Sequence, residues 1–397
     1  MPNEPVTLLE PAERKSPRAG FSLAFLTNGS FTPDAPGGAK RGHKEIVDLF
    51  RVAEQLGYDR GWVRNRHFDN YSSSPLTIIA AAAQHTSRIH LGTAIIPVGY
   101  EDPIRLAEDA ATVDLLSDER LELGIATGIP GFSGIFGQGV APQDFKHYAG
   151  EKVERFLDAV DGIVLGAAPA DAPGPAAAVD LTRERVHGPS SGEGAGPGIQ
   201  YYVRPHSETL RGRIWYGPGS VESAEIAARQ GLDLLLSAIG PAIGLGFEGG
   251  QRAQIDAHRA AWTRTDREPR VSAARLFFPF VNDRQRRLYQ DYADLRNVEG
   301  PAASRPAGSL PPKALGAGAA APVAKAPAPG LLSPVVVAEP AEIVEYLRSD
   351  VAVQAADELS IFLPPGFTHA ENLELIENIA ELVARELGWA PSAEAVR

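Results

Sequence analysis

The 397-residue chain contains no cysteine, which excludes disulfide bonds, cysteine-ligated zinc and thiol catalysis. It also lacks long hydrophobic runs. Its longest apolar stretches, such as residues 78–83, are far shorter than the roughly 20 residues that a membrane span needs. The first residues have neither the basic region nor the apolar region of a signal peptide. We therefore expect a soluble, cytoplasmic protein.

Positive charge is in deficit, since 38 Lys and Arg stand against 50 Asp and Glu and give a net charge of −12. Such a surface repels nucleic-acid phosphates and anionic lipid headgroups, so we expect neither nucleic acid nor a membrane as partner. The histidines show no metal-ligand spacing, and the chain has no P-loop and no Gly-x-Ser-x-Gly motif. We therefore predict no metal site and no phosphoryl-transfer activity.

Short apolar runs alternate along the chain with amphipathic segments that begin at helix signals, as at Asp102-Pro103. The first half would equally suit an open doubly wound sheet, but eight strand–helix pairs predict an α/β fold closed into a (β/α)8 TIM barrel. The strands are expected at 21–27, 58–64, 88–97, 120–126, 213–216, 232–237, 271–280 and 358–363, and the helices at 43–56, 75–87, 103–117, 151–165, 220–230, 251–262, around 289–292, and at 372–387.

The predicted barrel occupies residues 19–397 as one domain, after a disordered lead-in at 1–18. Two insertions, 127–149 and 166–210, interrupt the region after strand four. Residues 300–330, rich in Ala, Pro and Gly, predict a flexible linker before strand eight. Because the loop after strand four lies at the mouth of a barrel, the insertion 127–149 with its phenylalanines is expected to form a lid and an apolar substrate wall.

Two blocks of sequence carry a family resemblance. Residues 65–128 contain, in order, a histidine followed by an aromatic, a Gly-Thr-Ala strand, a proline-initiated helix with Ala-Glu-Asp, then Leu-Leu-Ser and Arg-Leu-Glu-Leu-Gly. Residues 213–237 read RIWYGPGSVESAEIAARQGLDLLLS. This ordered set resembles the bacterial luciferase-like flavin monooxygenases, and weaker agreement continues over nearly the whole chain.

The resemblance implies a two-component monooxygenase that uses reduced FMN and O2 on a small organic molecule, with the flavin supplied by a separate flavin reductase. It also implies a homodimer, because relatives often dimerise through early-barrel helices. Two alternatives stay open: an F420-dependent oxidoreductase of the same fold, and a non-catalytic flavin-binding protein. The substrate does not follow from the sequence.

The segment Gly217-Pro218-Gly219-Ser220-Val221-Glu222-Ser223 lies between a strand and a helix. Glycines let the backbone approach a ligand, and a helix start offers unpaired N–H donors, so the segment suits a phosphate. It equally suits a tight turn with Ser220 as the N-cap. The resemblance assigns the FMN phosphate to Ser220 and Ser223, beside Gly217 and Gly219.

The ends of strands three and four are the other cofactor-binding candidates. The resemblance places Thr93 and Ala94 under the isoalloxazine ring and implies a non-prolyl cis bond between Ala94 and Ile95, although an ordinary buried strand explains the composition equally well. Thr127 and Gly128 follow strand four, where some relatives carry an arginine for the phosphate. Arg204, from the second insertion, is the candidate that would compensate the charge instead.

Asn65-Arg66-His67-Phe68 follows strand two, where luciferases carry Glu-His-His-Phe. His67 is a candidate proton donor or acceptor, although a histidine beside an aromatic is more often structural. Arg66 stands at the catalytic position of the luciferases, where it could supply a fixed positive charge or bind an anionic substrate. This change argues against luciferase activity itself.

Overall fold

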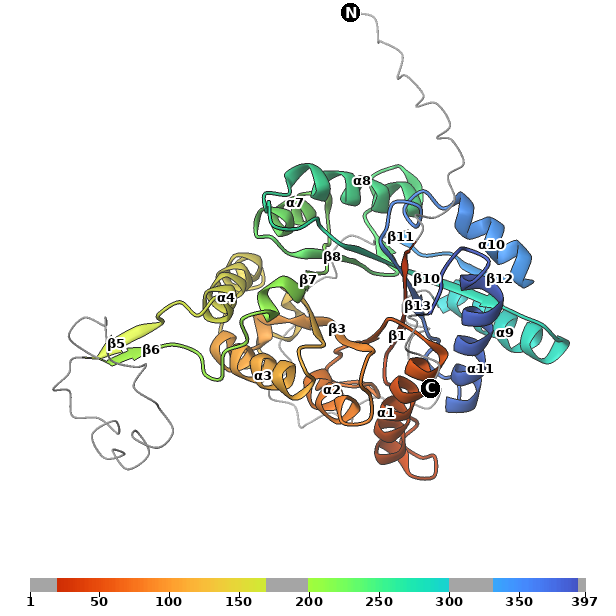
Figure 1. Cartoon of the computed structure of the whole chain (residues 1–397), viewed down its shortest axis with the longest axis horizontal. Helices are drawn as coiled ribbons and strands as arrows, with labels where there is room; N and C mark the ends of the chain where they lie inside the picture. Colours follow the sequence, from red (N-terminus) through yellow and green to blue (C-terminus); the bar gives the residue numbers. More distant parts are fainter. Residues whose placement is uncertain (1–19, 169–198, 300–330, 392–397) are drawn as a thin grey trace, which may run out of the picture.

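The computed structural model describes residues 20–168, 199–299 and 331–391. In them, a closed barrel of parallel strands is ringed by helices (Figure 1). The predicted lead-in at 1–18, the linker at 300–330 and most of the insertion at 166–210 lie outside the described residues. Among the described residues, no helix is both long and apolar enough to cross a membrane.

Eight parallel strands close the barrel, because the first strand pairs with the last and the sixth pairs with the seventh. This closure confirms the predicted TIM barrel over the open sheet, and every predicted strand is present within two residues of its expected bounds. In barrel order the strands are β1 (Ser22–Thr27), β2 (Arg60–Val63), β3 (His90–Pro97), β4 (Leu121–Ala126), β7 (Ile214–Tyr216), β8 (Asp233–Leu236), β10 (Val271–Pro279) and β13 (Glu358–Phe362).

The helices follow their strands, and several begin where the sequence signals predict. At the start of α3, the Asp102 carboxylate accepts hydrogen bonds from the amides of Ile104 and Arg105. The described helices are α1 (Gly38–Leu56), α2 (Pro75–Ala83), α3 (Pro103–Leu116), α4 (Phe145–Val160), α7 (Val221–Arg229), α8 (Gly246–Ala261), α9 (Asp283–Glu299), α10 (Pro340–Ser349) and α11 (His369–Ile379), which continues as a π-helix at Ala380–Ala384.

The prediction of a helix at 151–165 was wrong at both ends, because α4 begins at Phe145 and ends at Val160. Its buried stripe includes Phe145, Ala149 and Val153, which lie one turn apart and start inside the segment that was assigned to the loop. The helix ends before Gly162, whose φ of +71° is unfavourable for other residues.

The sequence analysis predicts no strand or helix at 331–357, and the structure shows that this is wrong. β12 (Val335–Ala338) pairs in parallel with β10, and α10 follows, with Pro340 in its first turn. Two helices, α9 and α10, therefore lie between β10 and β13, where one was expected.

Two short antiparallel strand pairs lie outside the barrel. The first joins β9 (Ile239–Gly240) to β11 (Leu331–Leu332). The second joins β5 (Gly166–Ala168) to β6 (Ile199–Tyr201), and this pair projects from the barrel (Figure 1).

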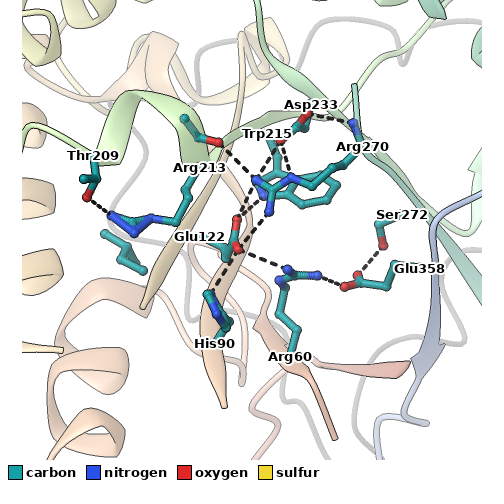
Figure 2. Close-up of polar contacts among 12 residues, drawn as sticks. Arg60, His90, Glu122, Thr209, Arg213, Trp215, Asp233, Arg270, Ser272 and Glu358 are labelled. Carbon is teal, nitrogen blue, oxygen red and sulfur yellow. Dashed lines mark hydrogen bonds and ion pairs between the residues drawn. The ribbon is translucent and has the colours of Figure 1, made fainter. Parts of the chain in front are cut away.

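A network of buried charges fills the barrel at the amino ends of its strands (Figure 2). Glu122 lies at its centre, where its carboxylate is 3.0 Å from Nη2 of Arg60, 3.1 Å from Nδ1 of His90 and 3.2 Å from the guanidinium of Arg270. Nε1 of Trp215 donates to the same carboxylate at 2.6 Å. Glu122 therefore ties β2, β3, β7 and β10 together.

A second carboxylate, Glu358 of β13, extends this network. It pairs with Arg60 and accepts from Nε1 of Trp62 at 2.8 Å and from the Ser272 hydroxyl at 2.6 Å. Above it the indoles of Trp62 and Trp215 pack edge to face, with ring centres 5.4 Å apart. Because ligands of TIM barrels bind at the carboxyl ends, we assign this lower layer to stability.

Candidate functional site

The carboxyl ends of β3, β4 and β7 meet at the mouth of the barrel. β3 contains the cis peptide bond between Ala94 and Ile95 that the resemblance implied. Ile95 lies against the β7–α7 loop, where a Cβ added to Gly217 would be 3.2 Å from Cγ2 of Ile95. The amide of Gly217 donates to the Ile125 carbonyl of β4 at 2.9 Å. The structure thus brings the predicted ring-binding strand and the predicted phosphate loop together.

The side chain of Thr93 serves the barrel wall. It is fully buried, and its hydroxyl donates to the carbonyl of Gly124 on β4 at 2.8 Å. Ala94 and Ile95, which follow, are half-buried. They are the residues of this strand end that reach the mouth.

The end of β4 is held to both neighbouring strands. The Thr127 carbonyl accepts from the Gly99 amide at 3.1 Å, and Thr127 also hydrogen-bonds to the phenol of Tyr216. Burial raises the pKa of Tyr216, and the bonds from Thr127 offset the shift only in part. Gly128 follows with a φ of +85°, and a Cβ there would lie 2.9 Å from Cβ of Pro97. Glycine is required because the backbone passes so close to β3.

Ser220 and Ser223 cap the start of α7 reciprocally. The Ser220 hydroxyl accepts from the Ser223 amide at 3.1 Å, and the Ser223 hydroxyl accepts from the Ser220 amide at 2.9 Å. Ser223 also donates to the Ser220 carbonyl at 2.9 Å. The N-cap that the sequence offered is therefore present. The amides of Val221 and Glu222 keep no acceptor within the helix, as in any first turn, and can face an anion.

A cation other than the predicted Arg204 pairs with the first turn of α7. Arg204 stacks on Tyr202, with its guanidinium carbon 4.3 Å from the ring centre, in the segment that leads towards the amino end of β7. Lys146, at the start of α4, lies 3.9 Å from the Glu222 carboxylate in the first turn of α7.

An aromatic cluster, here called the aromatic cap, covers the mouth beside β2 and β3. Tyr100 stacks on Phe136 with ring centres 4.9 Å apart, and Phe68 packs edge to face on Phe132 at 5.2 Å. Phe145 of α4 lies 5.5 Å from Tyr100 and completes the cap. The phenylalanines of the 127–149 insertion therefore do form an apolar wall.

His67 lies at the edge of the aromatic cap, with its ring centre 4.9 Å from that of Phe136 in an edge-to-face contact. Its Nε2 is buried and has no hydrogen-bond partner within the described part of the chain. Burial lowers the pKa of His67 below its usual value of 6.5. The imidazole is therefore neutral at pH 7.

We expect Phe136→Ala to raise the pKa of His67 towards 6.5, because water would then reach the imidazole. An NMR titration of the histidine ring signals, assigned with His67→Gln, measures this pKa. Phe31→Ala, which removes an aromatic packed on His43 instead, is the control and should leave it unchanged. An unchanged value in Phe136→Ala would show that the cap does not bury His67.

Arg66 contacts other residues than His67 does. Its guanidinium pairs with Asp69 at 3.2 Å and lies over the ring of Tyr71, 5.4 Å from the ring centre. Among the described residues, no group of three or more His, Asp or Glu side chains could hold a metal ion. The groups at the mouth are hydrogen-bond donors of the protein, one neutral imidazole (His67) and the fixed positive charge of Arg66.

Residues 23–357 match the model of the luciferase-like monooxygenase family. The chain belongs to this family. Its members are flavin-dependent monooxygenases and oxidoreductases, and they use FMN or F420.

Sequence similarity to a curated member covers part of the chain. The oxygenase component of a flavin-dependent trigonelline monooxygenase from Acinetobacter baylyi is 28% identical over 129 residues, which are 32% of this chain and 35% of the relative. The aligned stretches thus span about a third of the length of the curated relatives.

Solved structures share the fold over most of its length. The oxygenating constituent of 3,6-diketocamphane monooxygenase from Pseudomonas putida, in complex with FMN, has a TM-score of 0.60 at 14% identity and covers 92% of this chain and 99% of that one. The F420-dependent tetrahydromethanopterin reductase from Methanopyrus kandleri has a TM-score of 0.56 at 14% identity, with 93% and 100% covered.

Sequence reasoning missed three residues at the mouth of the barrel: Arg64, Tyr100 and Tyr216. Arg64 could have been found from the sequence, because alternate residues of a strand share a face. Arg60, Trp62 and Arg64 are alternate residues and are therefore expected on the same face. The two tyrosines end or follow apolar strands and carry no pattern that separates them from core residues.

Proposed function

We propose that this luciferase-like monooxygenase binds reduced FMN at its mouth and inserts an oxygen atom from O2 into a small organic molecule. A separate flavin reductase would supply the reduced flavin. The observation that carries the proposal is the β7–α7 junction, where two glycines and a helix N-terminus lie against the β3 strand end.

The residues of this junction fit a flavin phosphate. A side chain at Gly217 would crowd Ile95, so the loop depends on glycine to stay this close to β3. Nothing lies within 4 Å of a Cβ added at Gly219, so space for a ligand is open there. The amides of Val221 and Glu222 and the Ser220 hydroxyl would hold the phosphate, and Lys146 would add a positive charge.

Bound reduced flavin supplies the electrons that activate O2, and the protein's part is to position the substrate and exclude water. Ala94 and Ile95 would support the ring. The aromatic cap would keep water from the mouth. His67, held neutral by burial, could accept a proton at Nε2.

Titration of the protein with FMN tests this function. We expect saturable binding of oxidised FMN by fluorescence and of reduced FMN under anaerobic conditions, with O2-dependent oxidation following. F420 is the matched competitor, because a fold relative depends on it. Tight binding of F420 without FMN would replace the monooxygenase with an F420-dependent oxidoreductase. Binding of neither would contradict the proposal.

A further inference from the structure

Arg64 points into the mouth of the barrel. Alternate side chains of a strand share one face, so Arg64 continues the inward-facing row of Arg60 and Trp62. Its amide extends the ladder by donating to the Thr27 carbonyl of β1 at 2.9 Å. The guanidinium therefore stands above the tryptophan layer, at the carboxyl ends of β1 and β2.

Two further arginines, Arg66 and Arg296, add positive charge to the surroundings of Arg64. Burial, reinforced by the charges of Arg66 and Arg296, lowers the pKa of Arg64 to about 10 against the opposing effects of Tyr71 and Asp69. Arg296 of α9 is 6% exposed. The carboxylate of Asp69 pairs with Arg66 at 3.2 Å.

Buried donors without acceptors lie beside these arginines. Asn28 is 2% exposed, and its Oδ1 accepts from Nη1 of Arg64 at 3.2 Å, while its Nδ2 has no partner within the described residues. The fully buried Ser72 hydroxyl has none there either. Ser72 is fixed next to both groups, since its amide donates to the Asn28 carbonyl at 3.1 Å and its carbonyl accepts from the Arg66 amide at 3.0 Å. Such donors favour a ligand that brings acceptor oxygens.

We infer that the substrate of this enzyme is an organic carboxylate, whose anionic group docks on Arg64, Arg66 and Asn28 while its apolar body lies against the aromatic cap. Guanidiniums bind carboxylates through paired N–H donors. The cap begins at Phe68, two residues after Arg66, so charge and apolar surface adjoin. The inference rests on the proposed function, because it names the substrate class for the same mouth.

The same donors could in principle hold the flavin phosphate, but the barrel order favours the carboxylate. β1 and β7 are four strands apart in a closed barrel of eight, so they face each other across the mouth. A flavin whose phosphate lies at the β7–α7 loop leaves the β1–β2 side to the substrate.

Matched pairs of small probes test this inference on the full-length protein with FMN present and absent. Benzoate and octanoate are compared with benzamide and octanamide by calorimetry and ligand-observed NMR. We expect each carboxylate to bind at least about tenfold more tightly than its amide, since charge-assisted hydrogen bonds contribute more than one decade in affinity. Arg66→Gln and Arg64→Gln should each remove most of that preference and leave amide binding unchanged.

Arg252→Gln, which removes an exposed charge from α8, is the control and should preserve the preference. Arg66 is one-third exposed, so its variant is expected to fold even where Arg64→Gln does not. Equal affinity for acid and amide, or an unchanged preference in Arg66→Gln, would overturn the inference. A selective loss of FMN over riboflavin in Arg66→Gln would overturn it too, by assigning the arginines to the phosphate. Absence of FMN binding alone would defeat the proposed function and leave the carboxylate preference measurable.

Discussion

Replacement of Glu122 by alanine is expected to lower the free energy of unfolding by about 3–5 kcal/mol, the usual cost of removing one partner from a buried ion pair. Glu122 is fully buried, and its loss would leave Arg60 with one carboxylate partner fewer and the indole N–H of Trp215 without its acceptor. Because these groups come from different strands, the loss would weaken closure of the barrel.

Urea denaturation of the purified variant measures this effect. Glu225→Ala is the matched control, because Glu225 is exposed on α7 and its pair with Arg229, at 3.6 Å, should contribute less than about 1 kcal/mol. A loss of similar size in both variants would contradict the central role of Glu122.

The lowered pKa of Glu122 predicts that the protein loses stability in acid. Burial alone would raise the pKa of Glu122, but Arg60, His90 and Arg270 outweigh it and hold this pKa well below the usual value of 4.5. Its contribution is therefore complete above about pH 4.5 and is lost as the pH falls through the lower, folded-state pKa. Glu122→Gln should show a flatter dependence of stability on pH in that window than the parent protein.

Ser220→Ala is expected to weaken FMN binding by about 10–100-fold and riboflavin binding much less, because a hydrogen bond to a charged phosphate contributes about 1.5–3 kcal/mol. A hydroxyl proton can rotate, so Ser220 can cap the helix as an acceptor and still donate to an anion. Ser223→Ala should also weaken FMN binding more than riboflavin binding, because the two hydroxyls lie 3.2 Å apart.

The ratio of the two affinities separates phosphate binding from helix capping. Loss of the cap alone would cost about 1 kcal/mol of stability and leave the FMN-to-riboflavin ratio intact. Thr368→Ala removes the N-cap of a comparable capping box on α11 and is the matched control. If Ser220→Ala behaves like Thr368→Ala in both stability and ratio, the phosphate lies elsewhere.

The strands and most helices could be predicted because their signals are local. An apolar run gives a strand, and Asp102-Pro103 gives a helix start. The predicted bounds of α4 were wrong because Phe145 and Ala149 follow a glycine-rich stretch whose composition is typical of a loop. β12 was missed because four residues after a low-complexity tract give no periodicity.

The site could be predicted in part: Arg66 was a candidate from the sequence, whereas Arg64 was missed. The family resemblance indicated Gly217, Ser220 and the Ala94–Ile95 bond. In the lower layer, outside the site, Arg60 pairs with Glu358 although the two are 298 positions apart, and no sequence pattern links them. For Arg64 the alternation with Arg60 and Trp62 was a sequence signal, but its hydrogen bond to Asn28 is seen only in the structure.

The charge network at the amino ends of the strands separates the residues that keep the barrel closed from those that select the substrate. The chemistry is proposed for the opposite end, in loops that follow the strands, so the two demands fall on different residues. Substitutions in the aromatic cap or at Arg66 can therefore alter which molecule is accepted while barrel closure is maintained from below. For protein engineers, the lower layer is the part to leave untouched, and residues 129–144, between Gly128 and α4, are the part to randomise in a library for new substrates.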